Sequence, residues 1–164
     1  MILGGCGVSP EGPTLAPPAT PRTIELGWIE RDKNARFTFH VAQLVVAEHG
    51  WRATVSVTNR SKIAYRLEQR SVGLVLLETQ TPAELRRLTG NLSHPPPALK
   101  PIRASPAPPP ALGPGASWSG TVAGPEQLRE GSVVRVLFGP FSSIERFRSE
   151  AQDVLWVTDH AVRL

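Results

Sequence analysis

The chain is 164 residues long, has a net charge of +4 and contains a single cysteine. This length is sufficient for one domain with a hydrophobic core, and one cysteine excludes an internal disulfide and a cysteine-rich metal site. The 15 arginines and 3 lysines are scattered without a basic run, which favours a mixed solvated surface over a nucleic-acid-binding stripe. No apolar stretch of about 18 residues occurs, so the sequence predicts no membrane-spanning helix.

The N-terminal region differs in composition from the rest of the chain. Residues 7–21 hold five of the 17 prolines and few bulky apolar side chains. Such a segment is expected to form an extended, mobile tether rather than a packed element. We expect ordered structure to begin near Arg22.

Three strands joined by short turns are predicted next. Residues 22–29 and 37–47 are rich in β-branched and aromatic side chains, and residues 51–58 alternate strictly between apolar and polar. Strict alternation is typical of a strand with one face against the core. The apolar face of this strand holds Trp51, Ala53, Val55 and Val57, and the polar face holds Arg52, Thr54, Ser56 and Thr58. Asn59 to Lys62 then have the composition of an Asx turn.

The middle of the chain changes character twice. Residues 63–69 and 72–78 are predicted as strands, and residues 81–89 as a short helix that begins with a capping box and a proline at its first position. Residues 94–114 contain nine prolines, which no central strand can accommodate. This segment is expected to form a long polyproline-like excursion.

Beyond this excursion the strand pattern returns, in residues 116–123, 132–139 and 153–164. About seven to eight short strands with turns between them predict an all-β fold, an antiparallel β-sandwich over residues 22–164 with a Pro-rich insertion at about 94–114. The four tryptophans fall in separate predicted strands, where core packing is their expected role: Trp28, Trp51, Trp118 and Trp156.

Three segments resemble strands of bacterial immunoglobulin-like domains. WRATVSVTNRS (51–61) is similar to the second and third strands of such domains on extracytoplasmic proteins. RVLFGPF (135–141) and WVTDHAVRL (156–164) look like the closing strands of actinobacterial-type lipoproteins of uncharacterised function. The resemblance implies an immunoglobulin-like sandwich, but these motifs serve packing and carry no chemistry.

Leu3-Gly4-Gly5-Cys6 resembles the lipobox of bacterial lipoprotein signals, in which the cysteine sulfur receives lipid. The resemblance implies that Cys6 is the lipid attachment site and that the tether lifts the domain off the membrane. Only three residues precede the glycines, so the signal is expected to be truncated, with the true start upstream. The alternative is a disordered tail with an exposed thiol in a cytoplasmic protein.

Candidate metal ligands are few. A copper or zinc site needs two or more histidines to converge with further ligands. His40, His49 and His160 are the residues that a periplasmic metal-handling protein could use, although their spacing matches no known ligand motif. Unrelated histidines are the simpler interpretation.

Catalytic patterns are also weak. Asp159 and His160 place an acid beside a base, but neighbouring strand residues point to opposite faces. No nucleophile elbow, phosphate-binding loop or paired carboxylates for glycoside chemistry stands out, although a spatially assembled hydrolase site stays open. An aromatic and a basic residue alternate onto different faces in 51–58, which argues against nucleic-acid stacking there.

The sequence therefore predicts a non-enzymatic protein without a cofactor. It would be an extracytoplasmic lipoprotein, anchored to the bacterial cell membrane through Cys6, whose domain is a binding or accessory module. An anionic envelope polymer or a protein is the expected partner, and nucleic acid is not. The metal-handling protein and the small hydrolase are the alternatives.

Overall fold

The structure, a computed structural model, describes residues 15–77, 83, 87, 95–145 and 153–164. Every strand pair in these residues is antiparallel. The strands are β1 (Arg22–Arg31), β2 (Phe37–Ala47), β3 (Gly50–Asn59), β4 (Tyr65–Arg66), β5 (Val72–Leu76), β6 (Arg103–Ser105), β7 (Ala111–Leu112), β8 (Ser117–Gly124), β9 (Val133–Phe141), β10 (Val154–Val157) and β11 (Val162–Arg163).

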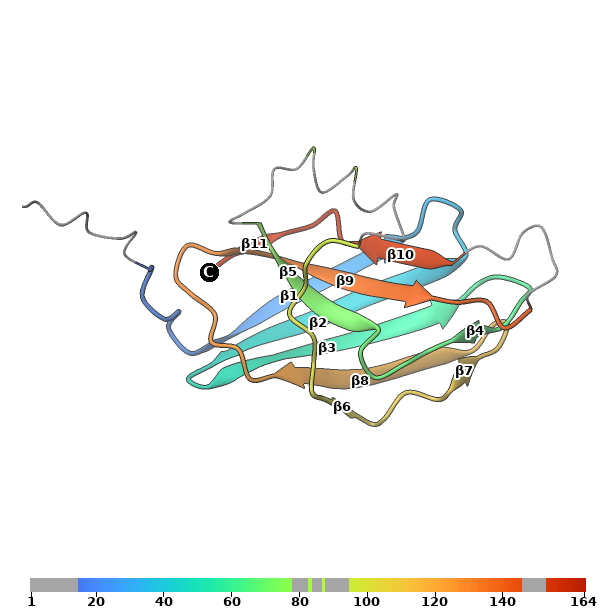
Figure 1. The fold of residues 1–164 in the computed structure, drawn as a ribbon, viewed down its shortest axis with the longest axis horizontal. Coiled ribbons are helices and arrows are strands. Elements are labelled where there is room, and N and C mark those ends of the chain that lie inside the picture. Colours follow the sequence, from blue (N-terminus) through green and yellow to red (C-terminus); the bar gives the residue numbers. More distant parts are fainter. Residues whose placement is uncertain (1–14, 78–82, 84–86, 88–94, 146–152) are drawn as a thin grey trace, which may run out of the picture.

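These strands form three sheets (Figure 1). A five-stranded sheet has the order β1-β2-β3-β8-β6. A four-stranded sheet is centred on β9, which pairs with β5 along one side and with β10 and β11 along the other. A small third sheet pairs β4 with β7. The all-β, antiparallel prediction is confirmed.

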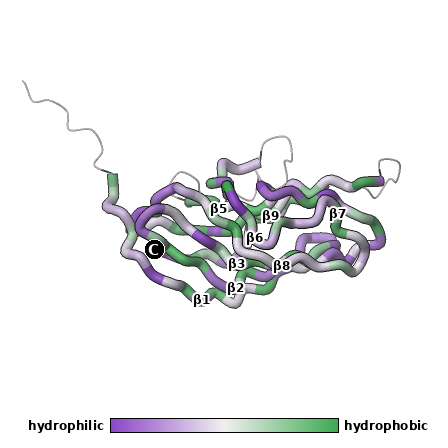
Figure 2. Tube along the Cα trace, turned by 90° about the horizontal axis from the view of Figure 1, so that it is seen from below, coloured by the Kyte–Doolittle hydropathy of each residue, from purple (hydrophilic) through white to green (hydrophobic). Residues whose placement is uncertain are grey.

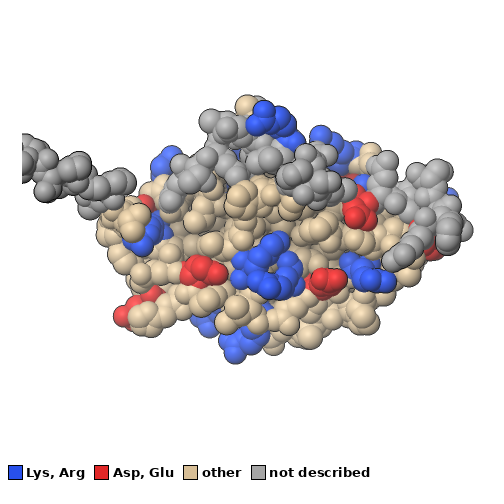
Figure 3. Space-filling model, in the orientation of Figure 1, with Lys and Arg blue, Asp and Glu red and all other residues tan. Residues whose placement is uncertain are grey.

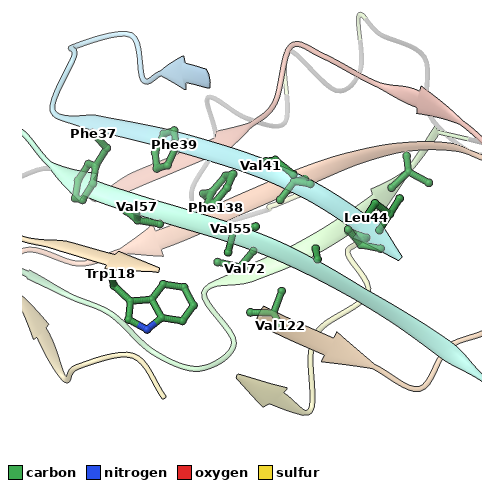
Figure 4. Packing of buried hydrophobic residues seen from close by; sticks show 14 of the residues in the cluster. Phe37, Phe39, Val41, Leu44, Val55, Val57, Val72, Trp118, Val122 and Phe138 are labelled. Atoms are coloured by element: carbon green, nitrogen blue, oxygen red, sulfur yellow. The ribbon is translucent and has the colours of Figure 1, made fainter. Parts of the chain in front are cut away.

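The two larger sheets share one hydrophobic core. Alternate residues of β2 and β3 are buried, which gives each strand an apolar inner face, and the outer face of β3 is polar after Trp51. Hydrophobic and hydrophilic residues are accordingly interspersed along the strands (Figure 2). Figure 4 shows side chains of both sheets packed together, and the rings of Phe39 from β2 and Phe138 from β9 stack with centroids 4.6 Å apart.

Two of the four tryptophans are buried in the hydrophobic core. Trp51 and Trp118 are 1% and 6% exposed, whereas Trp28 and Trp156 are partly buried and pack against the edge of the core. All four lie in separate strands, as the sequence predicts.

The turn after β3 has the predicted Asx geometry. The side-chain oxygen of Asn59 accepts a hydrogen bond from the backbone N–H of Ser61 at 2.9 Å. Its side-chain amide donates to the carbonyl oxygens of Ile63 at 2.7 Å and Leu112 at 2.9 Å. Asn59 is fully buried, so one side chain fixes the turn and attaches it to β7.

Several predicted boundaries change. The strand expected at 63–69 is reduced to β4, and the one expected at 153–164 is divided into β10 and β11. The Pro-rich segment is not only an excursion, because it contains β6 and β7. Since β6 lies at the edge of its sheet, the prediction that no central strand runs here is confirmed.

Contacts of the described chain begin a few residues before Arg22. Ala19 is buried, and its backbone N–H donates to the carbonyl of Leu128 at 2.8 Å. The backbone N–H of Thr20 donates to the Glu130 carboxylate at 2.7 Å. The last part of the predicted mobile tether is therefore attached to the domain. The carbonyl oxygen of Ala16 accepts a hydrogen bond from the Arg129 guanidinium at 2.6 Å, and that of Pro17 accepts one from the backbone N–H of Glu130 at 2.9 Å. The tether before Leu15, including Cys6, and the helix expected at 81–89, apart from two of its residues, lie outside the described residues.

Candidate functional site: a basic pocket on the five-stranded sheet

A pocket of about 570 Å³ lies at one end of the five-stranded sheet, next to the turn between β2 and β3. Its centre is a row of three residues on neighbouring strands. Ala123 of β8 pairs with Arg52 of β3 on one side and with Arg103 of β6 on the other. Cross-strand partners share a face, so both arginines project outward, away from the core.

The pocket exists because small and long side chains alternate in this region. Ala47, Ala123 and Gly124 form a low floor on a sheet surface that would otherwise be flat. Arg52 and Arg103 stand on either side of it, with Cα atoms two strand spacings, or roughly 10 Å, apart. The lining is completed by His49, Trp51, Ile102 and Pro125.

The surroundings of the pocket are firmly held. Trp51 is buried beside it, and its indole N–H donates to the Glu126 carboxylate at 3.0 Å. The backbone N–H of Ile102 donates to the carbonyl of Ala123 at 2.9 Å, which fixes the start of β6 against β8. The side chain of Ile102 is 68% exposed, an unusual position for a large apolar group.

The two arginines have no partner among the residues that the structure describes. Neither Arg52 nor Arg103 makes a side-chain hydrogen bond or ion pair there, and both are exposed. The nearby carboxylate of Glu48 lies 3.9 Å from the His49 ring, and both of these side chains are largely exposed. Arginine binds carboxylates and phosphates through paired hydrogen bonds. The pocket can therefore bind an anionic group from two sides.

Basic and acidic side chains are mixed over the face of the molecule that Figure 3 shows. On the face shown in Figure 3, a central group of basic side chains has acidic side chains on either side of it and uncharged surface between them. The scattered charge expected from the sequence is therefore visible on this face.

A second polar cluster joins the two larger sheets. Glu30 lies on the inner face of β1, and its side chain is only 7% exposed. One carboxylate oxygen accepts hydrogen bonds from the indole N–H of Trp156 and the backbone N–H of Asp159, both at 2.8 Å. The other oxygen accepts from the backbone N–H of His160 at 2.9 Å and lies 2.7 Å from Nδ1 of its ring. We call this cluster the Glu30 clasp.

The clasp keeps its acid ionised. Burial alone would raise the pKa of the Glu30 carboxyl. The hydrogen bonds favour the charged form more strongly, so the pKa of Glu30 lies below its ordinary value of 4.5. The His160 ring also stacks on Trp28 of β1, with centroids 5.7 Å apart. The loop between β10 and β11 is thereby attached to the edge strand of the other sheet.

The structure does not bring the three candidate metal ligands together. His40 is in the middle of β2 and faces outward beside Ile29, and His49 is at the end of the same hairpin, more than roughly 20 Å further along the strand. His160 belongs to the Glu30 clasp on the inner side of β1. The described part of the chain contains no group of three or more His, Cys, Asp or Glu side chains that could hold a metal ion.

The candidate catalytic histidine has a different partner from the one that the sequence suggests. His160 bonds to Glu30, whereas the Asp159 side chain is exposed and only its backbone joins the clasp. Within the described residues, Nε2 of His160 makes no hydrogen bond to a serine or threonine hydroxyl. The acid and base are thus held together without a described nucleophile.

Two features of this region could not be predicted from the sequence. The alternation in 51–58 places Arg52 on the outer face correctly, but Arg103 lies in the Pro-rich segment, where the sequence predicts no strand. Glu30 directly follows the strand predicted over residues 22–29, and its partners are 126 to 130 residues away in the chain. Only the pairing of β6 with β8, and of β10 with β9, places these residues.

The described residues include no helix that is both long and apolar enough to cross a bilayer. Comparison of the chain with models of known protein families, with curated proteins and with solved structures gives no match.

Proposed function

We propose that this chain is a non-enzymatic binding module of the bacterial cell envelope that holds an anionic ligand between Arg52 and Arg103. The observation that carries the proposal is the pair of arginines without described partners on either side of a pocket. Two outward charges that repel each other contribute little to folding, but they complement a carboxylate or phosphate group. The net charge of +4 favours the same partners.

The fold supports this role. The shared core of a five-stranded and a four-stranded antiparallel sheet fits a β-sandwich of the immunoglobulin-like kind. Domains of this architecture commonly bind ligands on a rigid sheet face or at the loops at the ends of the sheets. The pocket combines both, because it lies on a sheet face and beside a hairpin turn.

Membrane attachment is the second part of the proposal, and it is supported by the sequence. The Leu3-Gly4-Gly5-Cys6 pattern and the Pro-rich segment after it fit a lipid anchor followed by a spacer. In cells that express the gene with its upstream region, a radiolabelled fatty acid should be incorporated into the wild-type protein and not into Cys6→Ser. Equal labelling of both proteins would refute the anchor.

The ligand proposal is tested by direct binding. A fluorescently labelled acidic oligosaccharide and inorganic polyphosphate serve as anionic probes in low salt. Replacement of both arginines by glutamine should weaken binding at least about tenfold, because each arginine makes charge-assisted contacts. Wild-type binding should also fall as salt is added.

Arg60 provides the matched control. It is exposed, lies just beyond the opposite end of β3 and does not line the pocket. Arg60→Gln removes one of the same charges and should change affinity less than about twofold. Equal losses in Arg60→Gln and in Arg52→Gln would show that only net charge matters, and the pocket would lose its role.

A further inference from the structure

The outer face of the five-stranded sheet continues from the pocket as a track of hydroxyl groups. Beyond Arg52, the outward positions of β3 alternate with the buried ones, and the same holds for β8. Every outward position of these two strands past the pocket is a serine or a threonine, and the neighbouring position on β6 is also a serine. We call this set the hydroxyl track: Thr54, Ser56, Thr58, Ser105, Ser117, Ser119 and Thr121.

The register places the track next to the arginines. Thr54, Thr121 and Ser105 form one row across three strands, two residues further along than the row of Arg52 and Arg103. The two rows are therefore roughly 7 Å apart. A ligand group held between the arginines can reach the first row of hydroxyls without leaving the sheet surface.

The track extends well beyond this first row. Ser56 pairs with Ser119 in the next row, and Thr58 pairs with Ser117 in the last. From Arg52 to Thr58 the strand advances by six residues, or roughly 20 Å. Short side chains along this length leave the surface low, so an extended chain can lie on it.

The hydroxyls retain hydrogen-bonding capacity. The hydroxyl oxygens of Thr54 and Thr121 lie 3.4 Å apart, and those of Thr58 and Ser117 lie 2.8 Å apart. Each pair can therefore share one hydrogen bond. A hydroxyl has one donor and two acceptor sites, which leaves further sites for a ligand. The outward positions of β3, β6 and β8 carry no acidic side chain. The nearest acid in the first row is Glu25 on β1, where it accepts a hydrogen bond from Gln43 at 2.6 Å.

We infer that the ligand is an acidic polysaccharide, whose carboxylate is held between Arg52 and Arg103 while its sugar hydroxyls lie along the hydroxyl track. This inference rests on the proposed function and adds the class of ligand to it. Arginines alone would suit any polyanion, including one without hydroxyl groups. The hydroxyl track is complementary to a polymer that carries both charge and hydroxyl groups.

The experiment compares three soluble probes against the full chain in low salt: a galacturonate hexamer, a galacturonate dimer and inorganic polyphosphate of the same charge as the hexamer. The hexamer should bind at least about fivefold more tightly than the dimer or the polyphosphate. Only the hexamer can contact both the arginines and the full hydroxyl track. The double variant Thr54→Val/Thr121→Val keeps the β-branched shape but removes two hydroxyls. It should weaken hexamer binding about fivefold and change polyphosphate binding less than about twofold.

Thr23→Val is the matched control. Thr23 is exposed on β1, two strands away from Arg52 in the same row, and it is not part of the track. The affinity of Thr23→Val for the hexamer should equal that of the wild type. Far-ultraviolet circular dichroism and thermal unfolding establish that all variants are folded.

The outcomes separate the two proposals. If polyphosphate binds as tightly as the hexamer, or if Thr54→Val/Thr121→Val weakens both equally, the inferred ligand class is overturned while the anion-binding function stands. If neither polyanion binds the wild-type chain at low salt, the anion-binding function is overturned as well.

Discussion

The Glu30 clasp and the Arg52–Arg103 pocket lie on opposite faces of the same sheet, and their charged side chains differ in how many hydrogen-bond partners they have. The buried carboxylate of Glu30 accepts hydrogen bonds from Trp156, Asp159 and His160. The two arginines of the pocket meet no acceptor among the described residues.

This difference separates stability from function. A buried charge persists only when its hydrogen-bonding capacity is satisfied, so the clasp is explained by folding alone. Exposed charges around a pocket need no partner to be tolerated, and they leave binding capacity for a ligand. Substitutions in the clasp should therefore affect stability, and substitutions in the pocket should affect binding.

The largest effect is expected from Glu30→Ala. It leaves the indole N–H of Trp156 and two backbone N–H groups without their acceptor at the contact between the sheets. We expect a loss of about 3 kcal/mol in the free energy of unfolding, measured by urea denaturation. Glu25→Ala is the control on the same strand and should cost less than about 0.5 kcal/mol, because the only described hydrogen bond of the Glu25 side chain is an exposed one from Gln43. Similar losses of unfolding free energy in the two variants would show that the clasp makes no special contribution to stability.

The clasp should also make stability depend on acid pH. The pKa of Glu30 is lowered in the folded protein, so its ionised form stabilises the fold fully above the ordinary value of 4.5. This contribution is lost as the pH falls below 4.5 and through the folded pKa. Urea unfolding of the wild type and of Glu30→Gln should show a stability difference that is large at pH 7 and shrinks toward pH 3. A difference that stays constant over this range would contradict a charged Glu30.

The pocket should behave differently in the same assay. Arg52→Gln/Arg103→Gln removes two exposed charges without described partners, so the free energy of unfolding should change by less than about 0.5 kcal/mol. Ligand binding should be the property that changes. A loss above about 1 kcal/mol would show that the arginines support the fold, and the comparison with the clasp would fail.

The sequence predicts those parts of the fold that have a local pattern. The alternation in 51–58 and the Asx turn at Asn59 are set by neighbouring residues, and both are confirmed. β6 has only three residues and lies between Pro101 and Pro106, so it is too short to show an alternating pattern and its pairing could not be predicted. The arginine pair depends on that pairing.

The Glu30 clasp was missed for a related reason. A glutamate at the end of a strand looks the same in sequence whether it faces solvent or another sheet. Its environment is decided by how the four-stranded sheet packs on β1, through contacts between residues more than a hundred positions apart. The candidate site therefore required the three-dimensional arrangement, although Arg52 itself was placed on the correct face.

The smallest effect concerns a third place, where two cations lie near each other. Burial lowers the pKa of Lys100 below its ordinary value of 10.5, and the positive charge of Arg70 lowers it further. Because the charged form of Lys100 is disfavoured in the folded protein, Arg70→Gln should raise the pKa of Lys100 and stabilise the fold at neutral pH by about 0.3 kcal/mol. Nuclear magnetic resonance titration of the Lys100 side chain measures the first effect, and thermal unfolding measures the second. Arg66→Gln, an exposed arginine on β4, should change neither. If the pKa of Lys100 does not rise in Arg70→Gln, the charge of Arg70 has no measurable effect on Lys100, and burial alone would account for its lowered pKa.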